Sequence, residues 1–153
     1  MVSDEEIFQS YHELWLQIRD VVIQHKKAKG YYGRARILHT LDKRADLSQR
    51  QLADVVSMKP GSLTEALEKM ESQGLVTRKR DVHDKRIIRV AITPSGQREW
   101  AHIQQDRKSF GRQLLSSLTS EEREQAVKIA TKLHQSLVDC YGENKLRKEF
   151  FDD

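Results

Sequence analysis

The order of elements expected between Leu47 and Gly96 constrains this fold more than any other feature of the chain. Two short segments with helical spacing of apolar residues come first, and two short segments rich in β-branched residues follow them. The sequence therefore predicts two helices joined by a tight turn and then a β-hairpin. This order is typical of helix-turn-helix proteins that bind DNA.

The first helix of the pair is expected to begin at Ser48. Ser48 and Gln51 have the spacing of a capping box, in which a hydroxyl and a side-chain amide three residues later satisfy free backbone donors. Only residues 57–59 separate this helix from the next one, so the two helices must cross sharply. The inner face of the first helix is expected to carry Leu52, Val55 and Val56.

The second helix is expected to begin near Pro60, because the fixed φ angle of proline suits a first helical turn, and to end at Gly74. Its helical spacing turns Leu63, Leu67 and Met70 inward. Small side chains on the exposed side of its start would let it approach base edges closely; they are Gly61, Ser62, Thr64 and Ala66.

The hairpin is expected to have strands at 75–80 and 87–92, with a polar loop at 81–86. Two acidic residues, Asp81 and Asp84, are outnumbered in this region by basic ones. The basic residues are Arg78, Lys79, Arg80, Lys85, Arg86 and Arg89. A ribbon of positive charge beside the helix pair would attract a phosphate backbone.

Four motifs in a fixed order resemble the winged helix-turn-helix of the MarR family of bacterial transcription regulators. They are Leu67–Met70 in the second helix, Gly74–Val76 at its exit, Asp84–Arg86 in the wing and Ile92–Gly96 after the last strand. The resemblance implies a mainly α fold with a small β-hairpin wing (α+β), flanked by N- and C-terminal dimerisation helices. It implies a DNA-binding regulator, with repression as the usual outcome.

The resemblance also implies which residues would meet DNA. Ser62 and Thr64 would offer hydroxyls to bases or phosphates, and Lys69 would meet a phosphate. In the wing, Asp84 would orient Arg86 toward the minor groove, where a narrow A·T-rich groove attracts an arginine. The complete expected set is Pro60, Gly61, Ser62, Thr64, Glu65, Lys69, Arg78, Arg80, Asp84, Lys85 and Arg86.

Two residues depart from the family pattern. Lys59 stands where a capping serine or threonine is common, and Glu65 stands where a basic or neutral contact residue is frequent. Glu65 could accept from a cytosine amino group or pair with Lys69 four residues on, and we favour the ion pair. An alternative function follows from the same residue: a winged-helix module for protein association, with weak or no DNA binding.

Long amphipathic helices are expected on both sides of this lobe. Capping boxes at Ser3 and Thr119 each precede a row of apolar residues, and Pro94 opens another long helix in which Gly111 could introduce a kink. These rows exceed what a small core needs, which predicts a homodimer. Twofold symmetry in turn predicts a pseudopalindromic operator in double-stranded DNA, with recognition helices about 34–36 Å apart.

The whole chain is expected to form a single MarR-like domain, 1–153. Its parts would be an N-terminal dimerisation helix (1–30), a winged helix-turn-helix lobe (34–93), C-terminal dimerisation helices (94–141) and a tail (142–153). With 153 residues and 37% hydrophobic content, one domain with its own core is expected. The formal net charge of +4 is mild, so the basic hairpin is a stronger indication of DNA binding than the total.

Ligand binding is implied by the resemblance, because family members often bind a small anionic aromatic compound between the dimer base and the DNA-binding lobe. Candidate residues by family position are Trp15, Arg19, Tyr32 and His39. Cys140 is expected to be a buried structural thiol rather than a redox switch. The six histidines show no metal-binding spacing, and no cofactor is expected.

Other classes of protein find little support. The sequence has no phosphate-cradling glycine loop, metalloprotease helix motif or nucleophile elbow, so we expect no enzyme. No apolar run approaches the roughly 20 residues that span a bilayer, so no membrane partner is expected. A single cysteine and the absence of an apolar N-terminal signal predict a reducing cytoplasm.

Overall fold

The computed structural model describes residues 1–26 and 31–142 and is mainly helical, as predicted. A small antiparallel sheet accompanies the helices, which confirms the expected fold class. The elements in chain order are α1 (Asp4–Lys26), α2 (Tyr31–Lys43), β1 (Leu47–Ser48), α3 (Gln49–Val56), α4 (Pro60–Ser72), β2 (Val76–Arg80), β3 (Ile88–Ile92), α5 (Pro94–Leu114) and α6 (Ser120–Tyr141). Of the expected tail, residues 143–153 lie outside the described residues.

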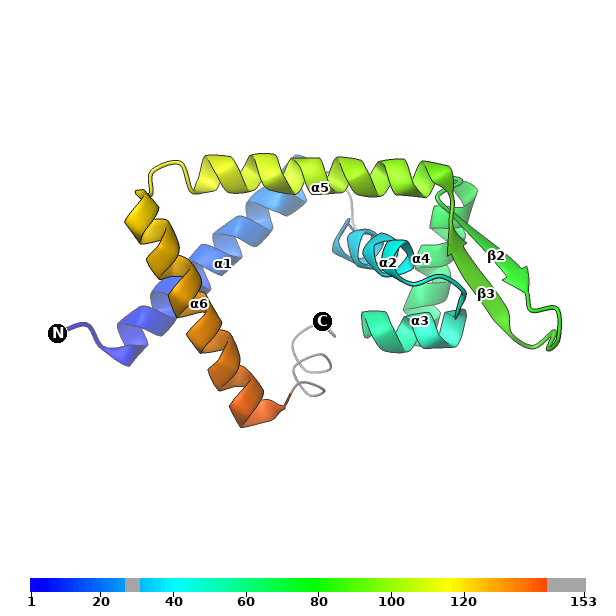
Figure 1. Cartoon of the computed structure of the whole chain (residues 1–153), viewed down its shortest axis with the longest axis horizontal. Coiled ribbons are helices and arrows are strands. Elements are labelled where there is room, and N and C mark those ends of the chain that lie inside the picture. Colours follow the sequence, from blue (N-terminus) through cyan, green and yellow to red (C-terminus); the bar gives the residue numbers. More distant parts are fainter. Residues whose placement is uncertain (27–30, 143–153) are drawn as a thin grey trace.

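The core lies in the lobe formed by α2, α3, α4, the sheet and the first half of α5 (Figure 1). The inward positions predicted on α4, Leu63, Leu67 and Met70, are buried, and α2 contributes the buried residues Ile37, Leu38 and Leu41. On α3, Leu52 and Val56 are buried as predicted, whereas Val55 is only partly buried. Trp100 and Ile103 of α5 complete this core.

Local signals in the sequence explain where the helices of the pair begin and end. Ser48 accepts a hydrogen bond from the backbone amide of Gln51, and the side chain of Gln51 accepts one from the amide of Ser48. Ser57 ends α3 in the left-handed conformation, with a φ of 49°. Gly74 follows α4 with a φ of 70°, a conformation that glycine adopts without strain.

The sheet has three strands in the order β1-β3-β2, all antiparallel. The hairpin strands β2 and β3 were predicted within one residue at each end. Strand β1 was not predicted, because two residues, Leu47 and Ser48, are too few to show a period. Its pairing of Ser48 with Arg89 attaches the start of α3 directly to the central strand of the sheet.

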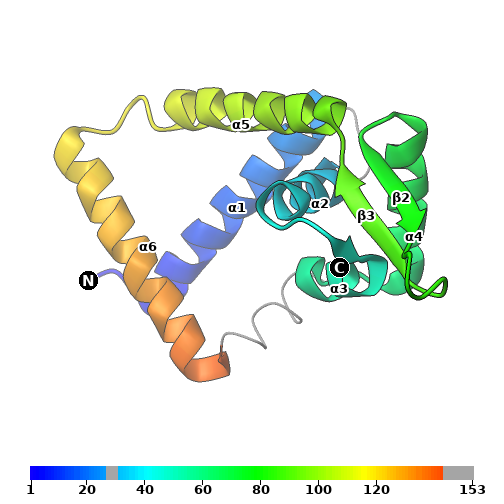
Figure 2. The same ribbon diagram turned by 45° about the vertical axis from the view of Figure 1, so that its right-hand side comes forward.

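The remaining helices extend away from this lobe. In Figures 1 and 2, α5 runs from the sheet to the far side of the molecule, and α6 turns back from its end. Gly111 does not interrupt α5, which continues through it to Leu114. The apolar rows of α1 and α6 are exposed, and none of the α6 residues is buried. Among the described helices none is long and apolar enough to cross a membrane.

Candidate nucleic-acid interface

The N-terminus of α4 is slim and exposed, as the sequence predicted. Pro60, Gly61 and Ser62 are all exposed, and the space where a Cβ of Gly61 would lie is empty to 4 Å. Lys59 occupies the N-cap position with extended backbone and makes no capping hydrogen bond with its side chain. The first turn of α4 therefore presents backbone to the outside with little side-chain cover.

Thr64 is placed differently from the other predicted contact residues. Its hydroxyl donates to the carbonyl oxygen of Pro60 at 2.9 Å and accepts from Nε2 of Gln49 at 2.8 Å. Thr64 therefore joins α3 to α4 and holds the two helices of the pair in register. Gln49 was not among the predicted site residues, because a glutamine at the start of a helix is usually only solvated.

Glu65 and Lys69 are both exposed on the second and third turns of α4. The ion pair that we expected between them is absent from the ion pairs of the described residues, so that expectation was wrong. The physical reason is that an exposed pair four residues apart gains only a few tenths of a kcal/mol and restricts two long side chains.

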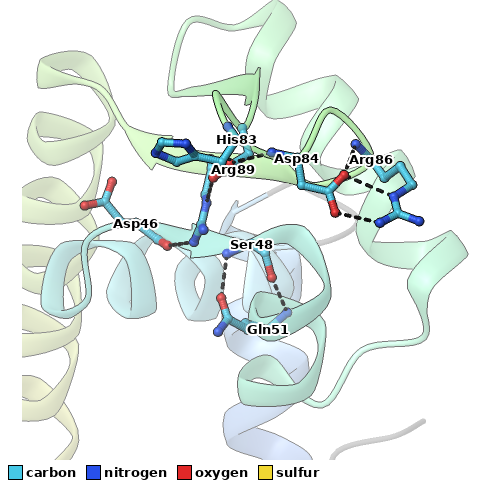
Figure 3. Close-up of polar contacts among 8 residues, drawn as sticks. Asp46, Ser48, Gln51, His83, Asp84, Arg86 and Arg89 are labelled. Atoms are coloured by element: carbon cyan, nitrogen blue, oxygen red, sulfur yellow. Dashed lines mark hydrogen bonds and ion pairs between the residues drawn. The ribbon is translucent and has the colours of Figure 1, made fainter.

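The wing presents Arg86 at its tip. The Nε atom of Arg86 lies 3.1 Å from Oδ1 of Asp84, and its Nη2 lies 3.1 Å from Oδ2 (Figure 3). These charge-assisted hydrogen bonds lower the pKa of Asp84 from its ordinary value. The side chain of Arg86 is nevertheless 91% exposed. Asp84 therefore orients an arginine that remains available to a ligand, beside the exposed Lys85.

The other two basic residues predicted for the wing have partners within the lobe. Arg78 binds the Glu71 carboxylate through Nε at 3.0 Å and Nη2 at 2.9 Å, which ties β2 to the end of α4 and lowers the pKa of Glu71. Arg80 donates to the carbonyl oxygen of Lys85 at 3.0 Å and braces the wing loop. Contacts of either residue with DNA remain predictions.

Asp81 and Arg89 form a pair that the sequence analysis counted only as charges. Oδ2 of Asp81 accepts from Nε of Arg89 at 2.8 Å. Oδ1 accepts from the amides of His83 and Asp84 at 2.9 and 3.1 Å. The pKa of Asp81 is held well below its usual range, chiefly by Arg89 and then by these two amides. The sequence held a signal for this pair, because Asp81 and Arg89 lie on either side of the wing loop. It also held a signal for the amide bond, because an aspartate often accepts from the backbone amide two residues later, here that of His83.

The four candidate ligand residues lie on two helices. On α1, the guanidinium of Arg19 lies over the ring of Trp15, 5.2 Å from its centroid. On α2, Tyr32 is exposed and the ring of His39 packs edge-on against Trp100 at 5.1 Å. Of the four, His39 lines a cavity of about 350 Å³. The other lining residues of that cavity are Arg36, Thr40, Lys43, Arg44, Val55 and Ser57.

Cys140 is exposed in the single chain, so the expectation of a buried thiol was wrong for the chain by itself. The reason is that α6, which carries it, extends away from the lobe (Figure 1), and none of its residues is buried. In the described part of the chain, no three histidine, cysteine or acidic side chains are grouped so that they could hold a metal ion.

A sharply crossed helix pair packed on a three-stranded sheet, with an arginine-tipped hairpin beside the second helix, defines a winged helix-turn-helix protein. Residues 32–88 match the model of the MarR family. This segment of the chain therefore resembles the winged helix-turn-helix that the MarR family model describes.

Individual relatives agree with this assignment. The chain is 30% identical over 100 residues to the HTH-type transcriptional repressor MdtR of Bacillus subtilis, a match that spans 65% of this chain and 64% of that protein. A mutant of MepR from S. aureus superposes with a TM-score of 0.72 at 21% identity, covering 89% of this chain and 99% of that one. A second MepR mutant, bound to an oligodeoxyribonucleotide, gives 0.60 at 21% identity, covering 90% and 99%.

Proposed function

We propose that this chain is a sequence-specific regulator of transcription that binds double-stranded DNA as a homodimer. The observation that carries the proposal is Arg86, which is 91% exposed at the wing tip and held there by Asp84. A guanidinium presented in this way fits the negative potential of a narrow minor groove. The match to a protein solved with an oligodeoxyribonucleotide supports the same use of the fold.

The exposed start of α4 would enter the adjacent major groove. Gly61 and Ser62 leave the backbone of its first turn accessible, and backbone amides at a helix N-terminus suit a phosphate. Glu65 and Lys69 project from the following turns of the same helix. Because the expected ion pair between them is not formed, we propose instead that Glu65 accepts a hydrogen bond from a cytosine amino group.

The dimer is supported by the exposed apolar residues on α1 and α6. Phe8 is 73% exposed, Trp15 56% and Leu133 47%, and single soluble chains rarely leave long rows of such residues in water. Association of two chains through these helices would place two lobes on one face of a duplex. The operator is then a pseudopalindrome with half-sites about one helical turn apart.

We further propose that the regulator is a repressor released by a small anionic compound. The relative MdtR is named a repressor. The cavity beside His39 is lined by Arg36, Lys43 and Arg44 and by no acidic residue, a charge that favours an anion. A ligand that binds more tightly to the DNA-incompetent arrangement lowers DNA affinity by the linked amount. The test is whether small aromatic carboxylates raise the melting temperature of the protein and reduce its DNA affinity.

Selection of duplexes from a random pool by the purified full chain tests the DNA-binding proposal. The selected duplex is then bound at two salt concentrations by the wild type and by Arg86→Ala, with Lys85→Ala as a variant that loses the same charge one residue away. We expect a pseudopalindrome whose affinity falls with salt. Arg86→Ala should weaken binding about tenfold and Lys85→Ala clearly less.

A protein-association module is the second candidate, favoured by the exposed acidic Glu65 on the helix that would otherwise face DNA. It predicts that no sequence is enriched from the pool and that duplex binding is weak at physiological salt. Such a result would overturn the proposed DNA-binding function.

A further inference from the structure

A continuous series of hydrogen bonds runs from the wing tip to the connection between α2 and β1, just before α3. At the tip, Oδ1 of Asp81 accepts from the amides of His83 and Asp84, and Asp84 in turn holds Arg86. The second carboxylate oxygen of Asp81 accepts from Nε of Arg89. Asp81 therefore connects the loop that carries Arg86 to the central strand of the sheet.

Arg89 extends this series beyond the wing. Its Nη1 donates to the carbonyl oxygen of Asp46 at 2.7 Å, in the connection between α2 and β1. Asp46 adopts a left-handed conformation with a φ of 58° and lies two residues before Ser48, the cap of α3. Ser48 also pairs with Arg89 in the sheet. One arginine thus contacts both the wing loop and the segment that leads into the helix pair.

The burial of the two side chains suits a mechanical role. The Asp81 side chain is only 13% exposed, whereas the guanidinium-bearing side chain of Arg89 is 40% exposed but uses Nε and Nη1 on Asp81 and Asp46. Strand β1 pairs only with Val90 and Arg89, so the wing loop lies beyond the three-stranded part of the sheet, at the end where only β2 and β3 pair. The loop of the wing needs such an anchor if it is to keep one conformation when no DNA is bound.

We infer that Asp81 and Arg89 are positioning residues, which fix the wing tip relative to the helix pair so that Arg86 and α4 meet adjacent grooves together. This inference rests on the proposed DNA-binding function and assigns to Arg89 an action through Arg86. When the loop is already ordered, DNA binding does not include the entropic cost of ordering it. Loss of the anchor therefore reduces affinity without removing a DNA contact.

The first test uses the full chain without DNA and measures amide hydrogen exchange by NMR. In Arg89→Gln, the amides of His83 and Asp84 should exchange about tenfold faster than in the wild type, because their acceptor carboxylate is no longer held. Buried amides of α4, such as that of Leu67, should keep their rates and show that the lobe is folded. Unchanged exchange at His83 and Asp84 would overturn the inference, whatever the DNA result.

The second test is a double-mutant cycle on the duplex selected by the wild type. Arg89→Gln should weaken binding about tenfold in the wild-type background and less than about twofold when Arg86 is already alanine. In the Lys85→Ala background the effect of Arg89→Gln should remain complete. An equal loss in all three backgrounds would show that Arg89 acts directly or only through stability, and would overturn the inference.

Arg89→Lys separates charge from geometry. A lysine keeps the positive charge, but its single nitrogen cannot occupy the positions of both Nε and Nη1, which donate to Asp81 and Asp46. We expect Arg89→Lys to bind as weakly as Arg89→Gln, and full affinity in the lysine variant would contradict the anchor. If the wild type selects no duplex, the proposed function fails while the exchange experiment still decides the role of Arg89.

Discussion

Arg86 illustrates how one residue can sense DNA without a base-specific bond. Its guanidinium is oriented by Asp84 and exposed, so we expect it to respond to the width of the minor groove. Replacing the A·T pairs under the wing by G·C should weaken binding about tenfold, because the guanine amino group lies in the minor groove.

The matched control for that experiment is a duplex with inosine·C pairs at the same positions. Inosine lacks the amino group, so it restores the minor-groove pattern of A·T while keeping the major-groove pattern of G·C. Competition binding should show recovery of affinity with inosine·C. Affinity that stays at the G·C level would mean that the wing does not contact the minor groove.

Asp81 should make the stability of the protein dependent on pH in the acid range. Its pKa is lowered in the folded state, first by Arg89 and then by the amides of Asp84 and His83. A lowered pKa in the folded state stabilises the protein. This contribution is complete above the pKa of the unfolded chain, about 3.9, and it is lost as the pH falls from there toward the pKa of the folded state. The wild type should therefore be more stable than Asp81→Asn at pH 7.

The measurement is urea unfolding of both proteins at pH 7, 5 and 3, at one protein concentration. The difference in free energy of unfolding between the wild type and Asp81→Asn should be equal at pH 7 and 5 and smaller at pH 3. A difference that grows as the pH falls would contradict the assignment of the lowered pKa to Asp81.

Gly96 is required by space rather than by backbone conformation. A Cβ at this position would lie 2.1 Å from the carbonyl oxygen of Leu75 and 2.7 Å from Cγ1 of Ile92. Gly96→Ala should lower the free energy of unfolding by about 1–3 kcal/mol through overpacking. Gly61→Ala is the control, since open space surrounds that position and its stability should hold or rise slightly. Equal stability of the two variants in urea unfolding would contradict this account.

At the scale of elements, the capping boxes explain why helix starts were predicted well. Ser48 and Gln51 exchange hydrogen bonds of 3.1 and 2.9 Å at the start of α3, and Thr119 and Glu122 do the same at α6. These signals act within four residues, so the sequence contains the whole interaction. Strand β1 and the Arg78–Glu71 tie were missed, because each depends on segments that meet only after folding.

The cap of α3 supports a prediction at this scale. Ser48→Ala should lower the free energy of unfolding by about 1 kcal/mol, because the amide of Gln51 loses its acceptor. Ser48→Asp keeps an acceptor and should retain most of the stability. Chemical denaturation of the three proteins checks this prediction. An aspartate variant with a free energy of unfolding as low as that of the alanine variant would show that the hydroxyl acts by packing.

At the scale of the whole molecule, the single chain leaves the apolar rows of α1 and α6 exposed. The apolar row of α6 includes Ile129, Leu133 and Leu137, each more than 40% exposed. We expect Leu133→Glu to shift the protein toward monomers in analytical ultracentrifugation and to weaken binding to a two-half-site duplex by at least about tenfold. Lys128→Glu changes charge on the opposite face of α6 and should remain dimeric. A dimeric Leu133→Glu would place the interface elsewhere.

The sequence by itself determined the helix pair and the hairpin, their order and most of the buried positions of the helix pair, while the pairing of Asp84 with Arg86 was implied by the family resemblance. All of these depend on residues close together in the chain or on a simple period. Tertiary structure alone decided that Thr64 joins the helix pair, that Arg78 holds Glu71 and that Arg89 connects Asp81 to Asp46. Arg89 and Asp46 are 43 residues apart, and no local rule indicates which of several exposed cations will find a distant carbonyl oxygen.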